Sequence, residues 1–274
     1  MSAVRHTFYP REHGAVAMLL TPFVAAAILS RAAKWQEAGA LVSCAMLFAM
    51  KDPLVVLARQ RLVWKQVHPE TRAALRWAVT ETIVLGLCGA ALVWDGPLIA
   101  YSLLFAGAVC FTVLAVWVTV RNRQRATMFQ VASSVALTST GLLAALSATG
   151  AVPLWCWELW GLMAVQAAAG IFTVHARLDL RVAARKPAFD ANQRAKLQRT
   201  AWIFAILLAL GGLATVIGRN YWIGAALLVT AIGYGVDLRT QLDNKSLQTP
   251  LTTIGLRALA LTVVYAALVV RGLW

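Results

Sequence analysis

Long apolar runs separated by short polar segments dominate the pattern of this sequence. Nine runs reach or approach the roughly 18–25 residues with which a helix crosses a lipid bilayer. Turn-forming residues such as Asp95-Gly96-Pro97 separate several of them. The pattern predicts an all-α polytopic membrane helix bundle of about nine transmembrane helices, at roughly residues 13–30, 36–50, 73–94, 97–119, 127–149, 153–175, 200–217, 220–237 and 254–271.

Two of the polar segments are much longer than the others. They cover about residues 51–72 and 176–199, follow the second and the sixth predicted helices, and are strongly basic. Because four helices separate them, both segments fall on the same side of the membrane. We treat residues 1–274 as a single transmembrane domain that carries both segments on its cytoplasmic side.

The composition excludes an ordinary soluble protein. Hydrophobic residues make up 60% of the chain and charged residues only 13%, whereas soluble domains are about 45–50% apolar and about 25% charged. The net charge of +14 would indicate a nucleic-acid partner in a soluble protein. Here the basic residues lie between apolar runs, so we expect membrane lipid as the partner and no nucleic acid.

Lysine and arginine are distributed unequally between the two sides of the predicted bundle. Of the 25 such residues, 21 fall on the side of the N-terminus and of the two long segments, and four fall on the other side. Positively charged loops stay in the cytoplasm during membrane insertion. The asymmetry therefore predicts a cytoplasmic N-terminus and an extracytoplasmic C-terminus.

Arg11, Glu12 and His13 stand together at the start of the first predicted helix. Such a group could bind an anionic headgroup or relay a proton. Alternatively, the arginine meets lipid phosphate and the glutamate interacts with the positive end of the helix dipole. Both interpretations remain open at this point.

Lys51-Asp52-Pro53 lies at the end of the second predicted helix. Aspartate before proline is typical of a helix N-cap followed by the first helical residue. The residues from Pro53 to about Val67 mix large apolar and basic side chains, as an amphipathic helix at the membrane surface does. Asp52 is therefore either a cap or a ligand-binding residue over a cavity.

The end of the sixth predicted helix carries a second polar group. His175 and Asp179 are four residues apart, which places them on one helical face. Another face has a polar stripe that we expect to lie inside the bundle, either as a cavity wall or as polar packing. Its members are Gln166, Gly170, Thr173 and Arg177.

Two further residues are candidates for chemistry. Glu81 lies within the third predicted helix, where a charged carboxylate costs about 2.5–3.5 kcal/mol if it is central. It therefore requires a polar partner or neutralisation. Arg123 follows the fourth predicted helix and could either bind phosphate or act as a positive anchor at the membrane surface.

Three segments together resemble a known family. They are the string Tyr9-Pro-Arg-Glu-His-Gly-Ala-Val-Ala-Met-Leu-Leu-Thr-Pro-Phe23, the end of the second helix from Phe48 to Leu54, and the end of the sixth helix up to Arg177. The first string closely resembles the opening signature of the YwiC-like family of bacterial membrane proteins. The resemblance implies a multi-pass protein of the bacterial cytoplasmic (inner) membrane.

The chain is also, more distantly, similar to the UbiA-type intramembrane prenyltransferases. That family has nine helices, a cavity open to the cytoplasm, and aspartate-rich motifs after helices 2 and 6 that hold magnesium ions and a prenyl diphosphate. The first motif, Asn-Asp-x-x-Asp, corresponds here to Lys51-Asp52-Pro53-Leu54-Val55. The second keeps Asp179 but has Arg181 and Arg185 where further acids are expected. The chain thus departs from the metal-binding pattern.

The resemblance and the polar residues together imply a protein that handles an isoprenoid or other anionic lipid in a cytoplasm-facing cavity, as a divergent prenyltransferase-like transferase. We expect no cofactor, and magnesium only if the remaining acids keep a UbiA-type site. The alternative is a non-enzymatic carrier, channel or accessory subunit, in which Glu81, His13 and His175 form a proton or ion path. The expected lipid site comprises Arg11, Glu12, His13, Lys51, Asp52, His175, Arg177 and Asp179.

Overall fold

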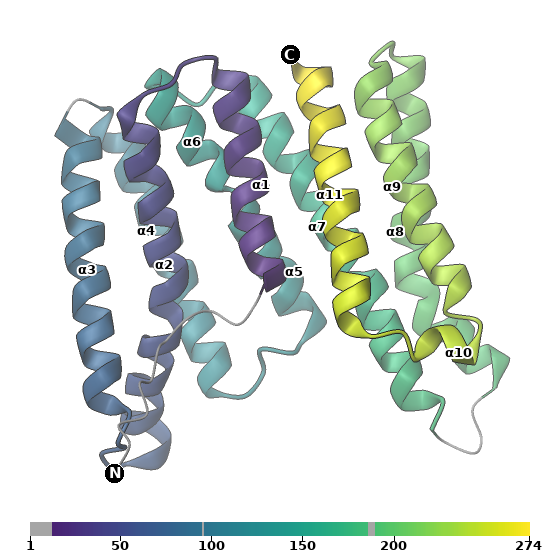
Figure 1. Ribbon diagram of the computed structural model, residues 1–274, viewed down its shortest axis with the longest axis horizontal. Coiled ribbons are helices and arrows are strands. Elements are labelled where there is room, and N and C mark those ends of the chain that lie inside the picture. The colour runs from purple at the N-terminus through teal and green to yellow at the C-terminus, as the bar shows by residue number, and fades with distance from the viewer. Residues whose placement is uncertain (1–12, 95, 186–189) are drawn as a thin grey trace.

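The computed structural model describes residues 13–94, 96–185 and 190–274, without the side chains of His13, Asn244 and Lys245. These residues form helices joined by short connections, and none of them lies in a β-strand (Figure 1). The helices are α1 (His13–Ser30), α2 (Trp35–Arg59), the π-helical turn η1 (Gln60–Trp64), α3 (Thr71–Trp94), α4 (Leu98–Val120), α5 (Thr127–Thr138), α6 (Thr140–Thr149), α7 (Leu154–Ala183), α8 (Ala191–Ile217), α9 (Tyr221–Thr240), α10 (Asn244–Leu247) and α11 (Leu251–Leu273).

The helices have the length and apolarity of membrane spans. Within the described residues, eight helical segments of at least 18 residues are apolar enough to cross a membrane, and Gly14–Ser30 adds a shorter apolar helix. The segment Thr127–Thr149 counts as one span, although it consists of α5 and α6. These segments confirm the predicted polytopic bundle of helices.

Many large apolar side chains point outward from the bundle. Leu87 of α3, Ile99 of α4 and Ile217 of α8 are exposed by 68%, 77% and 83%. A soluble protein seldom displays so much contiguous apolar surface, whereas lipid tails surround such side chains without cost. The inside of the bundle is rich in small residues such as Ala144 and Ala226, which let helices approach closely.

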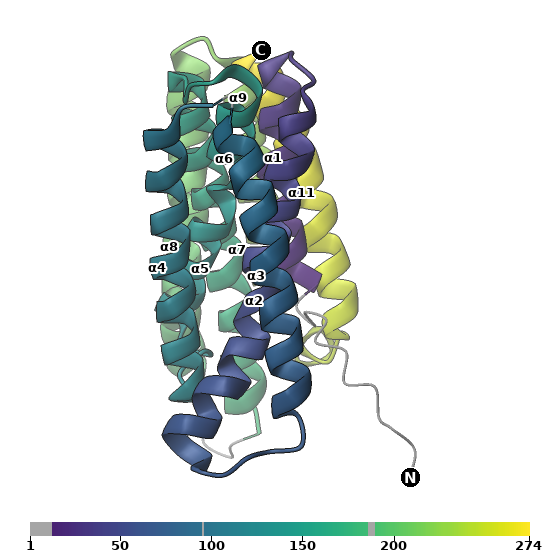
Figure 2. The ribbon, with the colours of Figure 1, turned by 90° about the vertical axis from the view of Figure 1, so that its left-hand side faces the viewer.

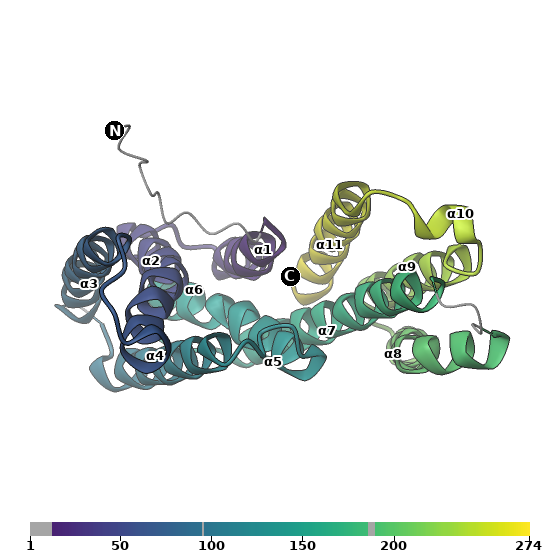
Figure 3. The same ribbon diagram turned by 90° about the horizontal axis from the view of Figure 1, so that it is seen from below.

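Two helical hairpins stand at opposite ends of the elongated bundle. The helices α2 and α3 pack against each other at one end, and α8 and α9 at the other (Figures 1 and 3). Between them α5, α6 and α7 lie along one side, while α1 and α11 lie side by side on the other (Figure 3). The axes of the long helices are roughly aligned (Figure 2), as expected for spans of one bilayer.

The structure corrects the expected end of the second span. Lys51-Asp52-Pro53 lies inside α2, which continues without a break to Arg59 and then into η1. Asp52 is therefore not an N-cap, and no separate surface helix begins at Pro53. Proline cannot donate to the carbonyl of the residue four positions earlier. Membrane helices tolerate this loss when neighbouring groups compensate, and here α3 packs along α2.

The second long segment is also shorter than expected. Helix α7 extends to Ala183 and α8 begins at Ala191, so most of residues 176–199 are helical. The Asp190 carboxylate accepts a hydrogen bond from the backbone N–H of Gln193 at 2.7 Å and caps α8. Asp190 thereby satisfies one of the backbone N–H groups that have no partner at the start of a helix.

The fifth predicted span is broken at Ser139, between α5 and α6. The break faces α1, where Pro22 lies inside the helix. The Thr140 hydroxyl donates to the carbonyl of Leu19 at 2.7 Å. A Cβ added to Gly141 would lie 3.1 Å from the carbonyl oxygen of Pro22. The two irregular helices therefore contact each other closely at the place where each departs from ideal geometry.

We call the end of the bundle that holds the connections after α2, α4, α7 and α9 the basic end. Lysine and arginine concentrate there, whereas Arg31, Lys34, Arg219 and Arg271 lie at the opposite end. The guanidinium of Arg31 stacks on the Trp274 ring at 3.9 Å from its centroid. At the basic end α1 begins well above the ends of α2 and α7 (Figure 1).

Candidate functional site

The polar stripe on α7 lies inside the bundle, as predicted. The side chains of Gln166, Thr173 and Arg177 are only 4%, 3% and 2% exposed. The Gln166 amide donates to the Tyr234 hydroxyl at 3.1 Å and to the Thr262 hydroxyl at 2.9 Å. The stripe thus joins α7 to α9 and α11 through direct hydrogen bonds. It is polar packing between helices at this level, not the wall of an open cavity.

Arg177 forms a buried ion pair. Its Nη2 lies 2.6 Å from Oδ1 of Asp237 on α9, and its Nη1 donates to the carbonyl of Ser246 at 2.8 Å. The other oxygen of Asp237 accepts from the Gln241 amide at 3.0 Å. The positive charge of Arg177 is therefore compensated within the protein. An anionic ligand would have to displace Asp237 in order to reach it.

Three arginines hold the connection between α9 and α11. Arg177 donates to Ser246, Arg181 donates to the carbonyls of Leu247 and Thr249, and Arg194 donates to the carbonyl of Leu242. We call Arg177, Arg181 and Arg194 the arginine clamp. They satisfy carbonyl groups around the short helix α10 that cannot be paired within a helix. Because the acceptors lie far along the chain, sequence reasoning did not find this role.

His175 connects α7 to α5. Its Nδ1 lies 3.2 Å from the Thr127 hydroxyl, and its Nε2 lies 2.8 Å from the side-chain oxygen of Gln130. Asp179, one turn further along α7, is exposed. The two residues that were expected to act together therefore have different surroundings. His175 is half-buried between two helices, and Asp179 faces away from the packed interior.

Glu81 is buried in the contact between α3 and α2. Its side chain is 2% exposed, and its Oε2 has no hydrogen-bond partner among the described residues. Asp52 on α2 is close enough to interact with it electrostatically. Lys51 and Asp52 are themselves half-buried. A carboxyl group in this position was anticipated, but its neighbour Asp52 was not.

The structure does not bring the predicted residues into one group. Lys51 and Asp52 belong to α2, and the basic ends of α2 and α7 lie on opposite sides of the molecule (Figures 1 and 3). Arg123 is exposed in the turn between α4 and α5. Arg11, Glu12 and the side chain of His13 lie outside the described residues, so their expected roles remain predictions.

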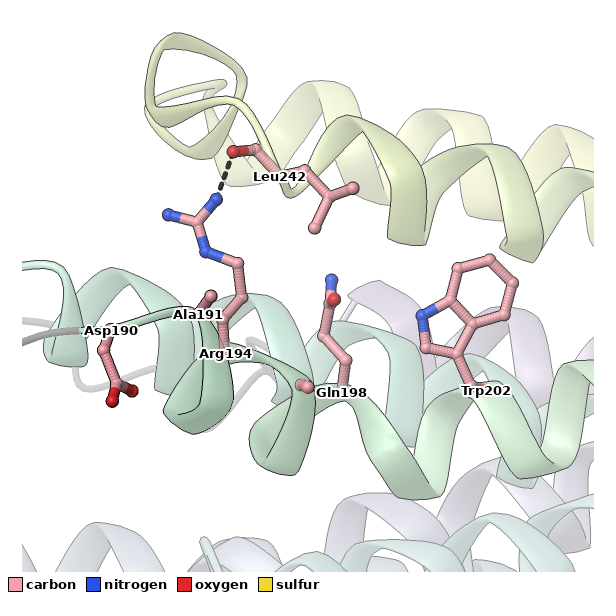
Figure 4. A pocket seen from close by; sticks show the side chains of 7 residues that line it. Asp190, Ala191, Arg194, Gln198, Trp202 and Leu242 are labelled. Carbon is pink, nitrogen blue, oxygen red and sulfur yellow. Dashed lines mark hydrogen bonds between the residues drawn. The ribbon is translucent and has the colours of Figure 1, made fainter.

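A pocket of about 540 Å³ opens at the basic end between α8 and the end of α9 (Figure 4). It combines one guanidinium, one buried amide and an indole ring with small apolar side chains. The Asp190 carboxylate points away from the Arg194 guanidinium (Figure 4). The lining residues are Asp190, Ala191, Arg194, Ala195, Gln198, Trp202 and Leu242.

Two residues that line the pocket also join α8 to the end of α9 through hydrogen bonds. The Gln198 amide donates to the carbonyl of Leu238 at 2.9 Å and to the side-chain oxygen of Gln241 at 3.3 Å. Arg194 reaches across the pocket mouth to Leu242. Because the pocket forms between the start of α8 and a residue some 50 positions later, no local sequence pattern predicts it. The spacing of Arg194, Gln198 and Trp202 at steps of four is the only signal in the sequence.

Metal-binding side chains do not gather in the part of the chain that the structure describes. No three His, Cys, Asp or Glu residues among those described lie close enough to hold an ion together. Hard cations such as Mg²⁺ bind several oxygen ligands. The residues that correspond to the UbiA-type motifs, Asp52 and Asp179, belong to α2 and α7, whose basic ends lie on different sides of the bundle (Figures 1 and 3).

Comparison with known proteins gives one family. None of the curated proteins compared with the chain matches it. The family described as YwiC-like protein matches residues 9–145, which run from before α1 into α6. The match includes the string from Tyr9 to Phe23 and covers half of the 274 residues. The chain therefore belongs to the YwiC-like protein family.

Proposed function

We propose that this protein binds an anionic amphipathic lipid, such as an isoprenoid phosphate, in the pocket between α8 and α9. The observation that carries the proposal is the meeting of a guanidinium and an indole ring in one pocket at the basic end of the bundle. Arginine is suited to phosphate through bidentate hydrogen bonds. The ring and the small apolar side chains beside it suit the first part of a lipid chain.

The charge around the pocket supports an anion. Lys196, Arg199 and Arg239 are exposed on the same two helices. Of the nearby acids, Asp190 caps α8, Asp237 pairs with Arg177, and Asp243 accepts hydrogen bonds from Ser246. A negative headgroup therefore approaches a surface of positive potential. Basic clusters at the membrane surface attract anionic lipids by about 1 kcal/mol per residue.

The position of Trp202 supports a binding site at the membrane boundary. Tryptophan prefers the level of the headgroups, where its ring is apolar and its N–H remains polar. Trp202 is half-buried against Gly235 on α9, with a Cβ at Gly235 lying 3.8 Å from the ring. With the basic end in the cytoplasm, as the lysine and arginine distribution predicts, the pocket opens to the inner leaflet of the bacterial cytoplasmic membrane.

The proposal concerns binding, and it includes no obligatory metal. A divergent prenyl transferase of the UbiA type would place acids from the second and sixth spans around one pair of ions. Asp52 and Asp179 do not fit that arrangement, because they belong to α2 and α7, whose basic ends lie on different sides of the bundle. We therefore assign recognition of the anion to arginine. The same pocket would serve a transferase, a lipid carrier or an accessory subunit.

The test is native mass spectrometry of the full chain, purified and mixed with phosphatidylglycerol, phosphatidylcholine or farnesyl diphosphate. Wild-type protein is expected to retain the two anionic compounds in preference to phosphatidylcholine. Arg194→Gln removes the positive charge but keeps a polar amide on the same helix, and Trp202→Ala removes the ring. Each change is expected to lower retention several-fold.

Arg199→Gln is the matched control, because Arg199 is an exposed arginine on the same helix that does not line the pocket. This variant weakens only the surrounding positive charge, so it is expected to lose much less retention than Arg194→Gln. Equal losses in Arg194→Gln and Arg199→Gln would indicate attraction by overall charge alone. No preference for anionic compounds in the wild type would contradict the proposed function.

A further inference from the structure

A carboxyl group lies deep in the first hairpin and takes no part in the proposed lipid site. Glu81 is the eleventh residue of α3, so it stands roughly 15 Å along the axis from the start of the helix. The helix is one of the candidate membrane spans. The Glu81 side chain is 2% exposed, and Oε2 is buried without a hydrogen-bond partner among the described residues.

Few charged groups surround Glu81 in the described part of the chain. From α2, Asp52 interacts with it electrostatically, and Lys51 precedes Asp52, with its Nζ 6.0 Å from the centroid of the Phe48 ring. On α3 itself Arg76 lies about one and a half turns nearer the basic end. Helix α4, which also packs against α3, contains no Asp, Glu, Lys, Arg or His.

The surroundings of Glu81 favour a proton over a metal ion as its ligand. An ionised carboxylate within a membrane is expensive unless it is paired, and Asp52 adds repulsion to a negative charge at Glu81. A metal ion would need several oxygen ligands, and the described residues contain no group of three potential ligands. A proton needs only one oxygen atom. It also removes the charge of the buried group.

We propose that Glu81 is an intramembrane proton-binding site, with Asp52 as the neighbouring carboxyl through which the proton exchanges with water at the basic end. When the site fills, a proton from water bonds to a carboxylate oxygen of Glu81, and the group becomes a neutral acid. When it empties, the same O–H bond breaks and the proton returns to water. Asp52 is half-buried, whereas Glu81 is buried, so water reaches the carboxyl group of Asp52 more easily than that of Glu81.

Infrared difference spectroscopy of the full chain in lipid nanodiscs tests the site. The protonated carboxyl band of Glu81 is expected in wild-type protein at neutral pH, to shift in D₂O, and to disappear reversibly as the pH rises. Glu81→Gln has nearly the same shape and is expected to lack this band. Glu158→Gln, which alters an exposed glutamate at the opposite end of the bundle, is expected to retain it.

Asp52→Asn tests the neighbouring carboxyl. Without the negative charge of Asp52, the band is expected to disappear at a lower pH, because ionisation of Glu81 meets less repulsion. If Glu81→Gln removes an ionised carboxylate band instead, the site holds no proton and the proposal is wrong. A band that persists at high pH and does not shift in D₂O would mean a permanently neutral group. Replacement of the band by Na⁺ or Mg²⁺ at constant pH would mean a cation site. Both outcomes overturn the proposal.

Discussion

Tyr234 of α9 packs directly against Gly170 of α7, and a Cβ at Gly170 would lie 2.7 Å from the Tyr234 hydroxyl oxygen. That hydroxyl accepts a hydrogen bond from the Gln166 amide at 3.1 Å. The absence of a side chain at Gly170 therefore allows the tyrosine to reach the polar stripe. Glycine is required here for close approach of a neighbouring side chain, not for an unusual backbone angle.

Gly170→Ala is expected to destabilise the protein by about 1–3 kcal/mol, because the new methyl group displaces the Tyr234 hydroxyl and leaves buried polar groups without partners. The control is Gly161→Ala on the same helix, where nothing lies within 4 Å of the added Cβ. That change is expected to be neutral or slightly stabilising. Thermal unfolding in detergent, followed by circular dichroism, compares the two. Equal midpoints would contradict the described contact.

Asp237→Asn is expected to destabilise the bundle strongly, by about 3–5 kcal/mol, because it leaves the buried guanidinium of Arg177 without its compensating charge. Asp179→Asn also removes an acid near the basic end, but Asp179 is exposed. Its effect is expected to stay within about 0.5 kcal/mol. The apparent unfolding midpoint of each variant checks the difference. Similar midpoints for the two variants would show that the Arg177–Asp237 pair contributes little.

The orientation of the chain gives a third prediction. A reporter enzyme fused after Trp274 is expected to behave as extracytoplasmic, and one inserted near Lys186 as cytoplasmic, because most lysines and arginines belong to the same side as Lys186. A phosphatase and a fluorescent protein, each active on one side only, give opposite signals at the two positions. If both reporters indicate the same side, the number of spans between Lys186 and Trp274 is not odd, and the predicted topology is wrong.

Binding of the anionic lipid is expected to survive removal of divalent ions. Farnesyl diphosphate should bind the purified protein equally well with a chelator and with added Mg²⁺, because arginine supplies the positive charge. Equilibrium binding in the two solutions measures this. If the chelator abolishes binding and Mg²⁺ restores it, the remaining acids form a metal site and magnesium is part of the ligand complex.

The spans and the buried stripe could be predicted because they depend on local patterns. An apolar run of sufficient length indicates a membrane helix wherever it occurs. Similarly, the spacing of Gln166, Thr173 and Arg177 fixes their common face on α7. Their burial follows from the cost of polar groups against lipid. The spans and the burial of the stripe can therefore be predicted without knowing which helix packs against α7.

The end of the second span was predicted wrongly because its sequence fits two structures. Asp52-Pro53 before a mixed basic and apolar stretch is typical of a new helix, but it also fits the interior of a longer one. Packing of α3 along α2 decides between them, and this contact is tertiary. The same limit applies to Asp237, which lies 60 positions from Arg177, and to the pocket between α8 and Leu242.

The arginine clamp has a consequence for biosynthesis. Arg177, Arg181 and Arg194 belong to helices that leave the ribosome before the carbonyl groups of residues 242–249 that they bind. Donors and acceptors meet only if α9 and α11 insert with their connection on the side of the membrane where the arginines already lie. A pair inserted upside down would leave Arg177 buried without Asp237. The clamp thus stabilises the last two spans only in the orientation that places their connection at the basic end.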